Sequence, residues 1–278
     1  MKNLETLLKN YYEHVAERAA LGIPPLPLNA EQTNCITELL EQNINLQNHN
    51  LLDLLINRVP PGVDEAAYVK ASWLTAIANN EKSCNLINPS KAIEILGTMI
   101  GGYNVNSLLE IIKKEDKKLS QTAVKVLKKI ILVYDTANDI FELSKNNIYA
   151  KEVLDSWAKA EWFTEKKALT KEIKCLVFKV NGETNTDDLS PAVHATSRPD
   201  IPLHALSMLE FKDKNGLQTL NDLKTQEIQI AYVGDVVGTG SSRKSAINSV
   251  IWHIGDNIPF VPNKKTGGIV IGGKIAPI

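Results

Sequence analysis

A glycine-rich turn between a predicted strand and a predicted helix constrains this chain more than any other stretch. The segment Glu227–Val233 alternates polar and apolar residues, which predicts a strand, and apolar residues recur at helical spacing from Ala246 to Ile254. The sequence between them, Gly234–Ser245, reads GDVVGTGSSRKS. Its glycines allow positive φ angles and the close approach of a ligand to the backbone. The chain must therefore pass from strand to helix through a tight turn.

The same turn predicts an anion-binding site. Ser241 or Ser242 is suited to cap the helix, and the free N–H groups at a helix start attract anions. Arg243 adds a planar cation that fits a carboxylate or a phosphate. Known nucleotide motifs are absent, because no Walker A lysine follows the glycines and Arg243 replaces the third glycine of GxGxxG. The competing interpretation is a plain turn with a capping serine and a solvated arginine.

Composition limits the class of protein. The chain has 278 residues, 44% of them hydrophobic, and a net charge of −1, which suits one large or two ordinary domains with no general attraction to nucleic acid or anionic membranes. It has no apolar run near ~20 residues and no signal-peptide pattern, so we expect a cytoplasmic protein with no membrane partner. Cys35, Cys84 and Cys175 are far apart, which argues against a metal or Fe–S site made by this chain alone.

Two domains are predicted, helical over residues 1–163 and α/β over 164–278. The helical periodicity begins at Leu4 and stops at the proline-rich break 23–27. Further helices are predicted over 30–42, 50–58, 64–79, 90–99, 107–113, 119–134 and 149–163. Short loops and antiparallel pairs indicate a small HEAT-like α-helical solenoid, although no clean sequence repeat is present.

In the second half of the sequence the pattern changes from helical to a mixture of strands, helices and polar loops. Its predicted elements are a strand at Ile173–Val180, a polar loop to Pro191, a helix at His204–Phe211, a polar connection at Lys212–Thr225, and strands on either side of the next helix. This order predicts an α/β layer. Asp187 and Asp188 are adjacent and point to opposite sides of an extended chain, so we expect them to stabilise the loop. Arg198, held extended by Pro199, either directs a cation at the glycine turn or is a surface residue.

Three segments of the second half together resemble the swivel domain of the aconitase superfamily. They are TNTDDLSP at 184–191, SRPDIPLHAL at 197–206 and YVGDVVGTGSSRKS at 232–245. In the first half, NRVPPGVDEAAYV at 57–69 and LGTMIGGY at 96–103 resemble the HEAT-like N-terminal domain of the bacterial B-type aconitases. The wider superfamily usually has Glu after Gly-Ser-Ser-Arg, and Lys244 at this place is what we expect of the B type.

The resemblance implies a hydro-lyase of the tricarboxylic acid cycle that interconverts citrate and isocitrate through cis-aconitate on a [4Fe–4S] cluster. Carried over by motif, Ser241 is the base, Ser242 and Arg243 bind a substrate carboxylate, and Arg198 is a further carboxylate contact. With no cysteine cluster here, the cluster ligands are expected outside this chain. We expect the chain to be the N-terminal part of a longer enzyme, with an incomplete swivel domain and no activity of its own.

Two alternatives stay open. One is a non-enzymatic helical module for self-association as a homodimer or for mRNA binding, both of which the resemblance also implies. The lysine-rich run from Lys113 to Lys129 is either an RNA-binding face or a solvated helix face, which is the commoner case. The other alternative is an isopropylmalate isomerase-like hydro-lyase subunit, which the long helical half and Lys244 disfavour.

Overall fold

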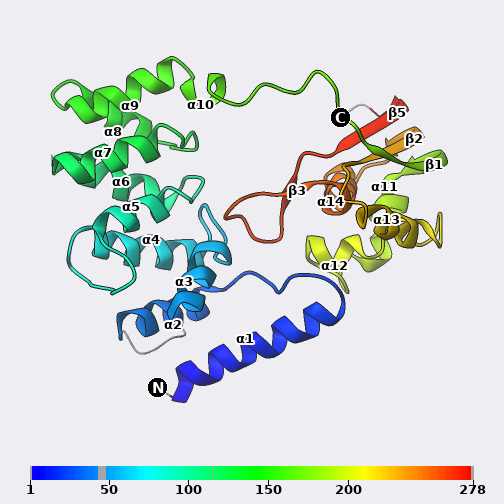
Figure 1. The fold of residues 1–278 in the computed structure, drawn as a ribbon, viewed down its shortest axis with the longest axis horizontal. Coiled ribbons are helices and arrows are strands. Elements are labelled where there is room, and N and C mark those ends of the chain that lie inside the picture. The colour runs from blue at the N-terminus through cyan, green and yellow to red at the C-terminus, as the bar shows by residue number, and fades with distance from the viewer. Residues whose placement is uncertain (1, 43–47, 115, 277–278) are drawn as a thin grey trace. The chain divides into compact units, whose positions relative to one another are not determined.

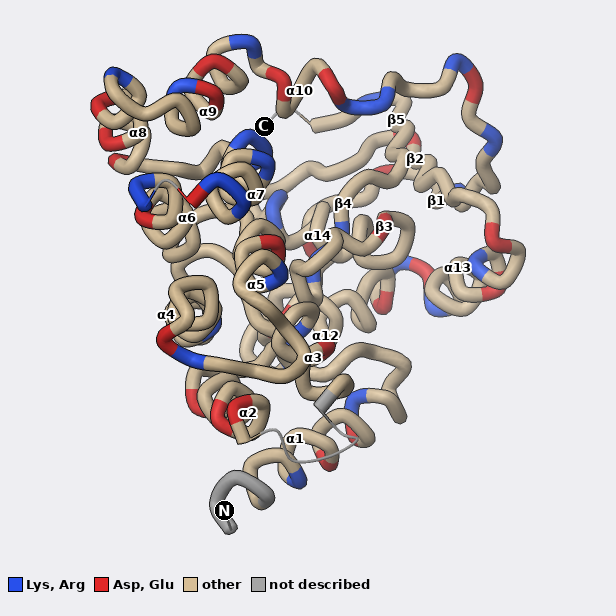
Figure 2. Tube along the Cα trace, turned by 60° about the vertical axis from the view of Figure 1, so that its left-hand side comes forward, with Lys and Arg blue, Asp and Glu red and all other residues tan. Residues whose placement is uncertain are grey.

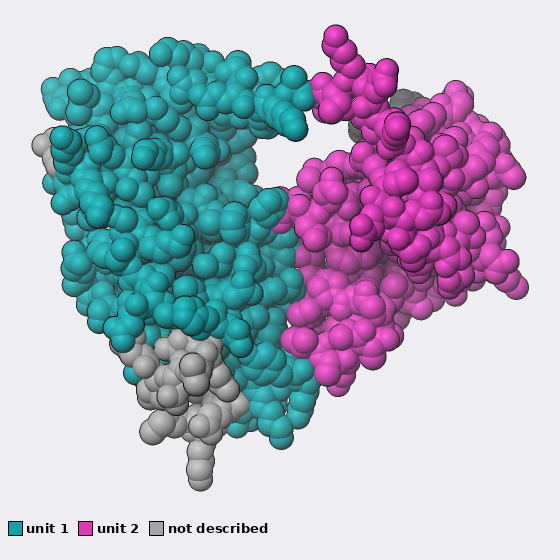
Figure 3. All heavy atoms as spheres, in the orientation of Figure 1, with its two compact units in different colours: residues 1–13, 26–168, 259–262 teal, residues 14–25, 169–258, 263–278 magenta. Residues whose placement is uncertain are grey.

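The computed structural model describes residues 2–42, 48–114 and 116–276 (Figure 1). These residues fall into two compact units, coloured separately in Figure 3. Unit 1 contains residues 1–13, 26–168 and 259–262, and unit 2 contains residues 14–25, 169–258 and 263–278. Unit 1 is helical and unit 2 is α/β, as the sequence predicts.

The helices of the first half are short and joined by short turns. They are α1 (Lys2–Ala20), α2 (Ala30–Glu41), α3 (Asn48–Asn57), α4 (Glu65–Ala78), α5 (Pro89–Leu96), α6 (Tyr103–Lys113), α7 (Lys117–Leu127), α8 (Thr136–Ser144), α9 (Ile148–Ala158) and α10 (Glu161–Thr164). From α2 to α8 the even-numbered helices contact one another in succession, and α5, α7 and α9 form a second row. The result is a two-layered helical array, visible in Figure 1.

Local chemistry explains where these helices begin. Asn29 and the third residue of α2 form a reciprocal capping box, and Asp64 and Asn88 accept backbone N–H bonds at the starts of α4 and α5. In the interior, Asn104 is fully buried and donates to the Leu96 carbonyl oxygen at 2.8 Å, so a polar side chain holds the turn after α5.

One long predicted helix is wrong. The periodicity over 119–134 predicts a single helix, but α7 ends at Leu127 and a separate helix, α8, begins at Thr136. The backbone at Leu132 instead forms a bridge with Gly101 of the preceding turn, and Tyr134 adopts a left-handed φ of 48°. Pairing between neighbouring turns thus overrides the local helical pattern, and sequence periodicity alone does not report such pairing.

Unit 2 is built on a parallel sheet. Its strands are β1 (Leu176–Asn185), β2 (Ile230–Thr239) and β5 (Ile269–Ile275), in the order β1-β2-β5, and β3 (Asp256–Asn257) pairs with β4 (Lys265–Thr266). Its helices are α11 (Thr186–Leu189), η1 (Ala192–His194), α12 (Ile201–Ala205), α13 (Gly216–Lys224) and α14 (Arg243–Ile254). The β2–α14–β5 unit is a βαβ crossover, which places the turn after β2 at the carboxyl edge of the sheet.

One face of the sheet forms the core of unit 2. Phe178 pairs in register with Tyr232, and Tyr232 with Val270, so the three side chains lie on the same face. Helix α14 packs against this core through Ala246, Val250 and Ile254. Burial raises the pKa of Tyr232 to about 12. The sheet therefore fixes the strand that leads into the glycine turn.

Some predictions in this half are wrong. The expected polar loop from Asn181 to Pro191 contains the second part of β1 and helix α11. The helix expected over His204–Phe211 is the shorter α12, which ends at Ala205, and the supposed connection Lys212–Thr225 contains α13. Asp200 caps α12, with Pro202 in its first turn, so the start signal lies upstream of the apolar run. Leu220 is fully buried in the core, and Leu217 and Leu223 pack against the same core, so three leucines dock α13 although the residues between them are mostly polar.

No helix among the described residues is long and apolar enough to cross a membrane.

We predict a loss of stability at acid pH from His253. Its Nε2 donates to the Ala205 carbonyl oxygen at 2.9 Å and its Nδ1 accepts from Lys224 Nζ at 3.0 Å, while burial, followed by the Lys224 charge, lowers its pKa to about 4. Between about pH 6.5 and about pH 4, His253 is therefore protonated in the unfolded chain but neutral in the folded chain. The free energy of unfolding keeps its full value above about pH 6.5 and falls by about 3 kcal/mol as the pH drops to about 4.

The measurement is urea unfolding at a series of pH values between about 4 and 7. His253→Gln does not titrate and is expected to flatten the profile, whereas His49→Gln, at an exposed position on α3, leaves the profile unchanged. Identical slopes for wild type and His253→Gln would contradict the assignment.

Candidate functional site

A glycine turn joins strand to helix as the sequence predicts, but it is shorter than expected, because β2 continues through Gly234 to Thr239 instead of ending at Val233. β2 ends at Thr239 and α14 begins at Arg243, so the turn is Gly240–Ser242. Gly238 and Gly240 have φ angles of 82° and 108°, which favour glycine. A Cβ atom at Gly240 would lie 2.3 Å from Thr186 Oγ1, so the turn touches the first residue of α11.

Three predicted site residues stand together at this turn. Ser241, Ser242 and Arg243 are all exposed. Ser242 occupies the N-cap position of α14, but its side chain makes no capping hydrogen bond in the described structure. The capping role expected for a serine is thus not fulfilled by Ser242, and its hydroxyl is available to a ligand. The arrangement offers two hydroxyls, a guanidinium and a helix N-terminus to an anion.

Arg198 lies on a different side of α14. It is half-buried and lines a cavity of about 170 Å³ with His204 of α12 and Ser245 and Asn248 of α14. Arg243 lines a second cavity, of about 300 Å³, whose wall is mostly apolar. The first turns of α14 therefore separate the two arginines, and each lines its own cavity.

The loop that carries Arg198 is anchored by a buried ion pair within unit 2. Arg18, only 6% exposed, donates from Nη1 and Nη2 to the two carboxylate oxygens of Asp200 at 2.9 and 2.6 Å. Its Nε also donates to the Pro24 carbonyl oxygen at 2.9 Å. A bidentate pair of this kind fixes both distance and orientation. Asp200, two residues from Arg198, is thereby held in place.

Of the two adjacent aspartates, Asp188 has the stabilising role that the sequence predicts, although both lie on the short helix α11 and not on an extended segment. Asp188 accepts from the Asn185 backbone N–H at 2.9 Å, while Asn185 Oδ1 accepts from the Asp188 N–H at 2.8 Å. This capping box starts α11. Asp187 is exposed beside it.

Three polar residues of this region escaped sequence reasoning. Ser190, His204 and Ser245 form hydrogen bonds with one another across 14 and 55 residues of sequence. Ser190 and His204 lie inside the segments that resemble the swivel domain, but no spacing rule marks them as partners. Only the packing of α11, α12 and α14 brings them together.

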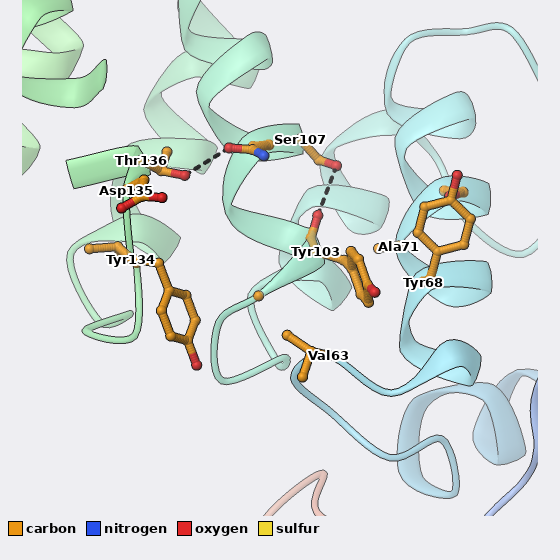
Figure 4. A pocket seen from close by; sticks show the side chains of 12 residues that line it. Val63, Tyr68, Ala71, Tyr103, Ser107, Tyr134, Asp135 and Thr136 are labelled. Carbon is orange, nitrogen blue, oxygen red and sulfur yellow. Dashed lines mark hydrogen bonds between the residues drawn. The ribbon is translucent and has the colours of Figure 1, made fainter. Parts of the chain in front are cut away.

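Unit 1 has a cavity of its own, of about 440 Å³, at the starts of α4, α6 and α8 (Figure 4). Tyr68 and Tyr103 meet edge to face at 5.1 Å in its wall. Its polar groups bond one another: Thr136 Oγ1 donates to Asn106 Oδ1 at 2.8 Å, and Ser107 also bonds within the wall. The cavity therefore lies where successive helices of unit 1 meet.

The described residues do not fit a metal centre. Among residues 2–42, 48–114 and 116–276, no group of three His, Cys, Asp or Glu side chains is placed to hold a metal ion. Cys35 and Cys84 are buried in unit 1, and Cys175 lies in unit 2.

Comparison with known proteins gives consistent matches. A family model described as the aconitate B N-terminal domain matches residues 10–163, and one described as the aconitate hydratase 2 N-terminus matches residues 175–278. Proteins named aconitate hydratase B from Synechocystis sp., Escherichia coli and Helicobacter pylori are 59%, 54% and 50% identical to this chain. These alignments cover 98%, 98% and 99% of the chain but 31%, 32% and 32% of the relatives. The chain thus spans about a third of the length of the relatives that it matches.

We predict that the two glycines of the turn differ in their tolerance of a side chain. Gly238→Ala meets no atom within 4 Å and suffers only the unfavourable φ, about 1–2 kcal/mol. Gly240→Ala suffers the same strain and also collides with the buried Thr186 side chain, which adds about 1–3 kcal/mol. Urea unfolding of the two variants measures the difference, and equal losses of stability would show that the contact with Thr186 has no role.

Proposed function

The chain belongs to the aconitate hydratase B family, and on this basis we propose that it is the N-terminal part of an enzyme that interconverts citrate and isocitrate through cis-aconitate. The observation that carries the proposal is the Gly-Ser-Ser-Arg turn at the start of α14, where both serines and the arginine are exposed. An interaction with a tricarboxylate needs several cationic and hydroxyl contacts, and this turn supplies three. The family assignment also removes support from the isopropylmalate isomerase-like alternative.

Ser241 is the proposed base. A serine hydroxyl is a poor base unless its anion is stabilised, and the first N–H groups of α14 together with Arg243 provide a fixed positive field at this place. In the proposed step, the alkoxide of Ser241 accepts the carbon-bound proton of the substrate, the electron pair of that C–H bond forms the double bond of cis-aconitate, and the hydroxyl group on the neighbouring carbon leaves as hydroxide. Ser242 and Arg243 hold a substrate carboxylate, which keeps the reacting carbon near that oxygen.

Arg198 is proposed as a further carboxylate contact. Its half-buried place beside Ser245 and Asn248 supports binding of an anion, because a guanidinium in a small polar cavity lacks bulk water as a competitor. The two arginines line different cavities on either side of the start of α14. The proposal therefore requires either that the substrate reaches both cavities or that the arginine side chains move toward one another.

The [4Fe–4S] cluster that the family resemblance implies does not fit the described residues, which offer no cysteine cluster. The proposed contribution of this chain is therefore restricted to holding the substrate and moving a proton. We propose that the cluster ligands belong to another part of the longer protein.

The division into domains is also a proposal. We assign residues 1–163 to a HEAT-like domain and residues 164–278 to a swivel-type domain. The two rows of antiparallel helices support the first assignment, and the β2–α14–β5 crossover with its terminal glycine turn supports the second.

No observation on the described residues favours mRNA binding. Two lysines of the run are in ion pairs, Lys113 with Glu110 at 2.6 Å and Lys128 with Glu152 at 2.7 Å. Figure 2 marks the acidic and basic residues along the chain. A lysine face that binds phosphates needs cations free of such partners. The two ion pairs therefore support the solvated-face interpretation for Lys113 and Lys128.

We predict that Ser241→Ala in the complete enzyme lowers kcat by about 100-fold to 10,000-fold with little change in KM, because proton transfer takes place only in the transition state. Stability changes little, since Ser241 is exposed. Ser83→Ala, at an exposed position in unit 1, is the matched control and retains full activity. Normal turnover by Ser241→Ala would rule out its role as base.

We predict that Arg243→Lys raises the KM for citrate by about 10-fold to 150-fold, because an ammonium ion cannot reproduce a bidentate contact to a carboxylate. Steady-state kinetics with citrate and with isocitrate provides the measurement. Lys244→Ala removes a neighbouring exposed charge and is expected to have a smaller effect, since solvent screens it. Equal effects of the two variants would leave only a general electrostatic role for Arg243.

A further inference from the structure

Three segments of unit 2 meet at the side chain of Ser190. Ser190 follows α11 and is only 4% exposed, His204 lies on α12 and is half-buried, and Ser245 lies in the first turn of α14. Ser190 Oγ is 2.8 Å from His204 Nε2 and 2.5 Å from Ser245 Oγ. On the other side of the imidazole ring, His204 Nδ1 is 3.1 Å from the carbonyl oxygen of Arg198.

The chemistry of the end groups fixes the direction of these bonds. A carbonyl oxygen only accepts, so His204 Nδ1 carries the proton and donates to Arg198. In a neutral imidazole Nε2 then accepts, and Ser190 donates to it. The Ser190 oxygen is left as an acceptor for the Ser245 hydroxyl. The chain of bonds runs in one direction, from α14 to the backbone of Arg198.

We propose that His204, Ser190 and Ser245 are positioning residues that hold Arg198 in register with the first turn of α14. The inference rests on the proposed function, in which Arg198 and the turn that begins α14 bind the same substrate. None of the three need touch the substrate. They act by fixing the distance between the two groups that do.

The rest of the Arg198 loop shows why this contact matters. The Arg198 N–H donates to the His194 carbonyl oxygen at 2.9 Å, and Asp200 is held by the buried Arg18. The carbonyl of Arg198 is thus a third point of attachment, and it is the one that leads directly to α14. Without it, the loop keeps its other anchors but loses its link to the helix that carries Ser241 and Arg243.

The experiment compares three variants of the complete enzyme with wild type. His204→Ala removes both ring contacts. In His204→Asn the side-chain amide nitrogen stands where Nδ1 stood, so the bond to Arg198 is retained, but no group stands where Nε2 stood, so the link to Ser190 and Ser245 is broken. His194→Ala is the matched control, since it removes a histidine ten residues away whose ring bonds only Glu210. The readouts are kcat and KM for citrate, the Kd of the inhibitor tricarballylate for enzyme without its cluster, and the melting temperature.

The expected result is that His204→Ala raises both KM and the inhibitor Kd by about 10-fold, the effect of losing one aligned contact, with a much smaller change in kcat. His204→Asn is expected to raise both constants as much as His204→Ala, because its link to Ser190 is also broken, and His194→Ala leaves them unchanged. A double variant of His204→Ala with Ser245→Ala is expected to be no worse than His204→Ala, because both act through one chain of bonds.

Three results would overturn the inference: KM and Kd of His204→Ala within twofold of wild type, constants near those of wild type in His204→Asn, or an equal loss in His194→Ala. A lower melting temperature with unchanged KM and Kd also counts against it, as it shows a purely structural role. If wild type neither converts citrate nor binds tricarballylate, the proposed function fails and the inference with it. Wild type is therefore measured before any variant.

Discussion

The close approach of Gly240 to Thr186 is the contact on which the arrangement of the site depends. With no Cβ at residue 240, the turn after β2 lies directly against the start of α11. This approach sets where α14 begins, and therefore where its N–H groups and the exposed Ser241, Ser242 and Arg243 stand. The parallel sheet behind the turn is buried on the Phe178 and Tyr232 face, so the strand that delivers the turn has little freedom.

The second arginine reaches the same helix by another route. Arg198 sits on a loop with little regular structure, yet the loop is fastened by a buried bidentate ion pair and by bonds to its own backbone. An exposed ion pair contributes little, but a buried one with both oxygens occupied is costly to break. These contacts therefore hold the loop, and with it the backbone of Arg198, in a fixed position although the loop has little regular secondary structure.

Sequence reasoning was strongest where the signal is local. The order of strand, glycine turn and helix follows from alternation, glycine content and helical spacing, although β2 continues to Thr239 and not only to Val233. A loop-stabilising role of Asp188 was predicted, but its place in the capping box of α11 was not. The break between α7 and α8 could not be predicted, because it depends on pairing between Leu132 and Gly101 in the folded chain. The chain from Ser245 to Arg198 was missed for the same reason. Its bonds join residues that only tertiary packing brings together.

Between α10 and β1 the chain runs from 165 to 175 without a helix or strand, and every residue from Phe163 to Lys174 faces solvent. The matches to the two family models end and begin on either side of this stretch. Because no packing holds its residues, its length can change by insertion or deletion at small thermodynamic cost. Over evolutionary time the length of this connection is thus free to change, while the contacts inside each unit are kept, among them the Arg18–Asp200 ion pair that ties residues 14–25 to the rest of unit 2.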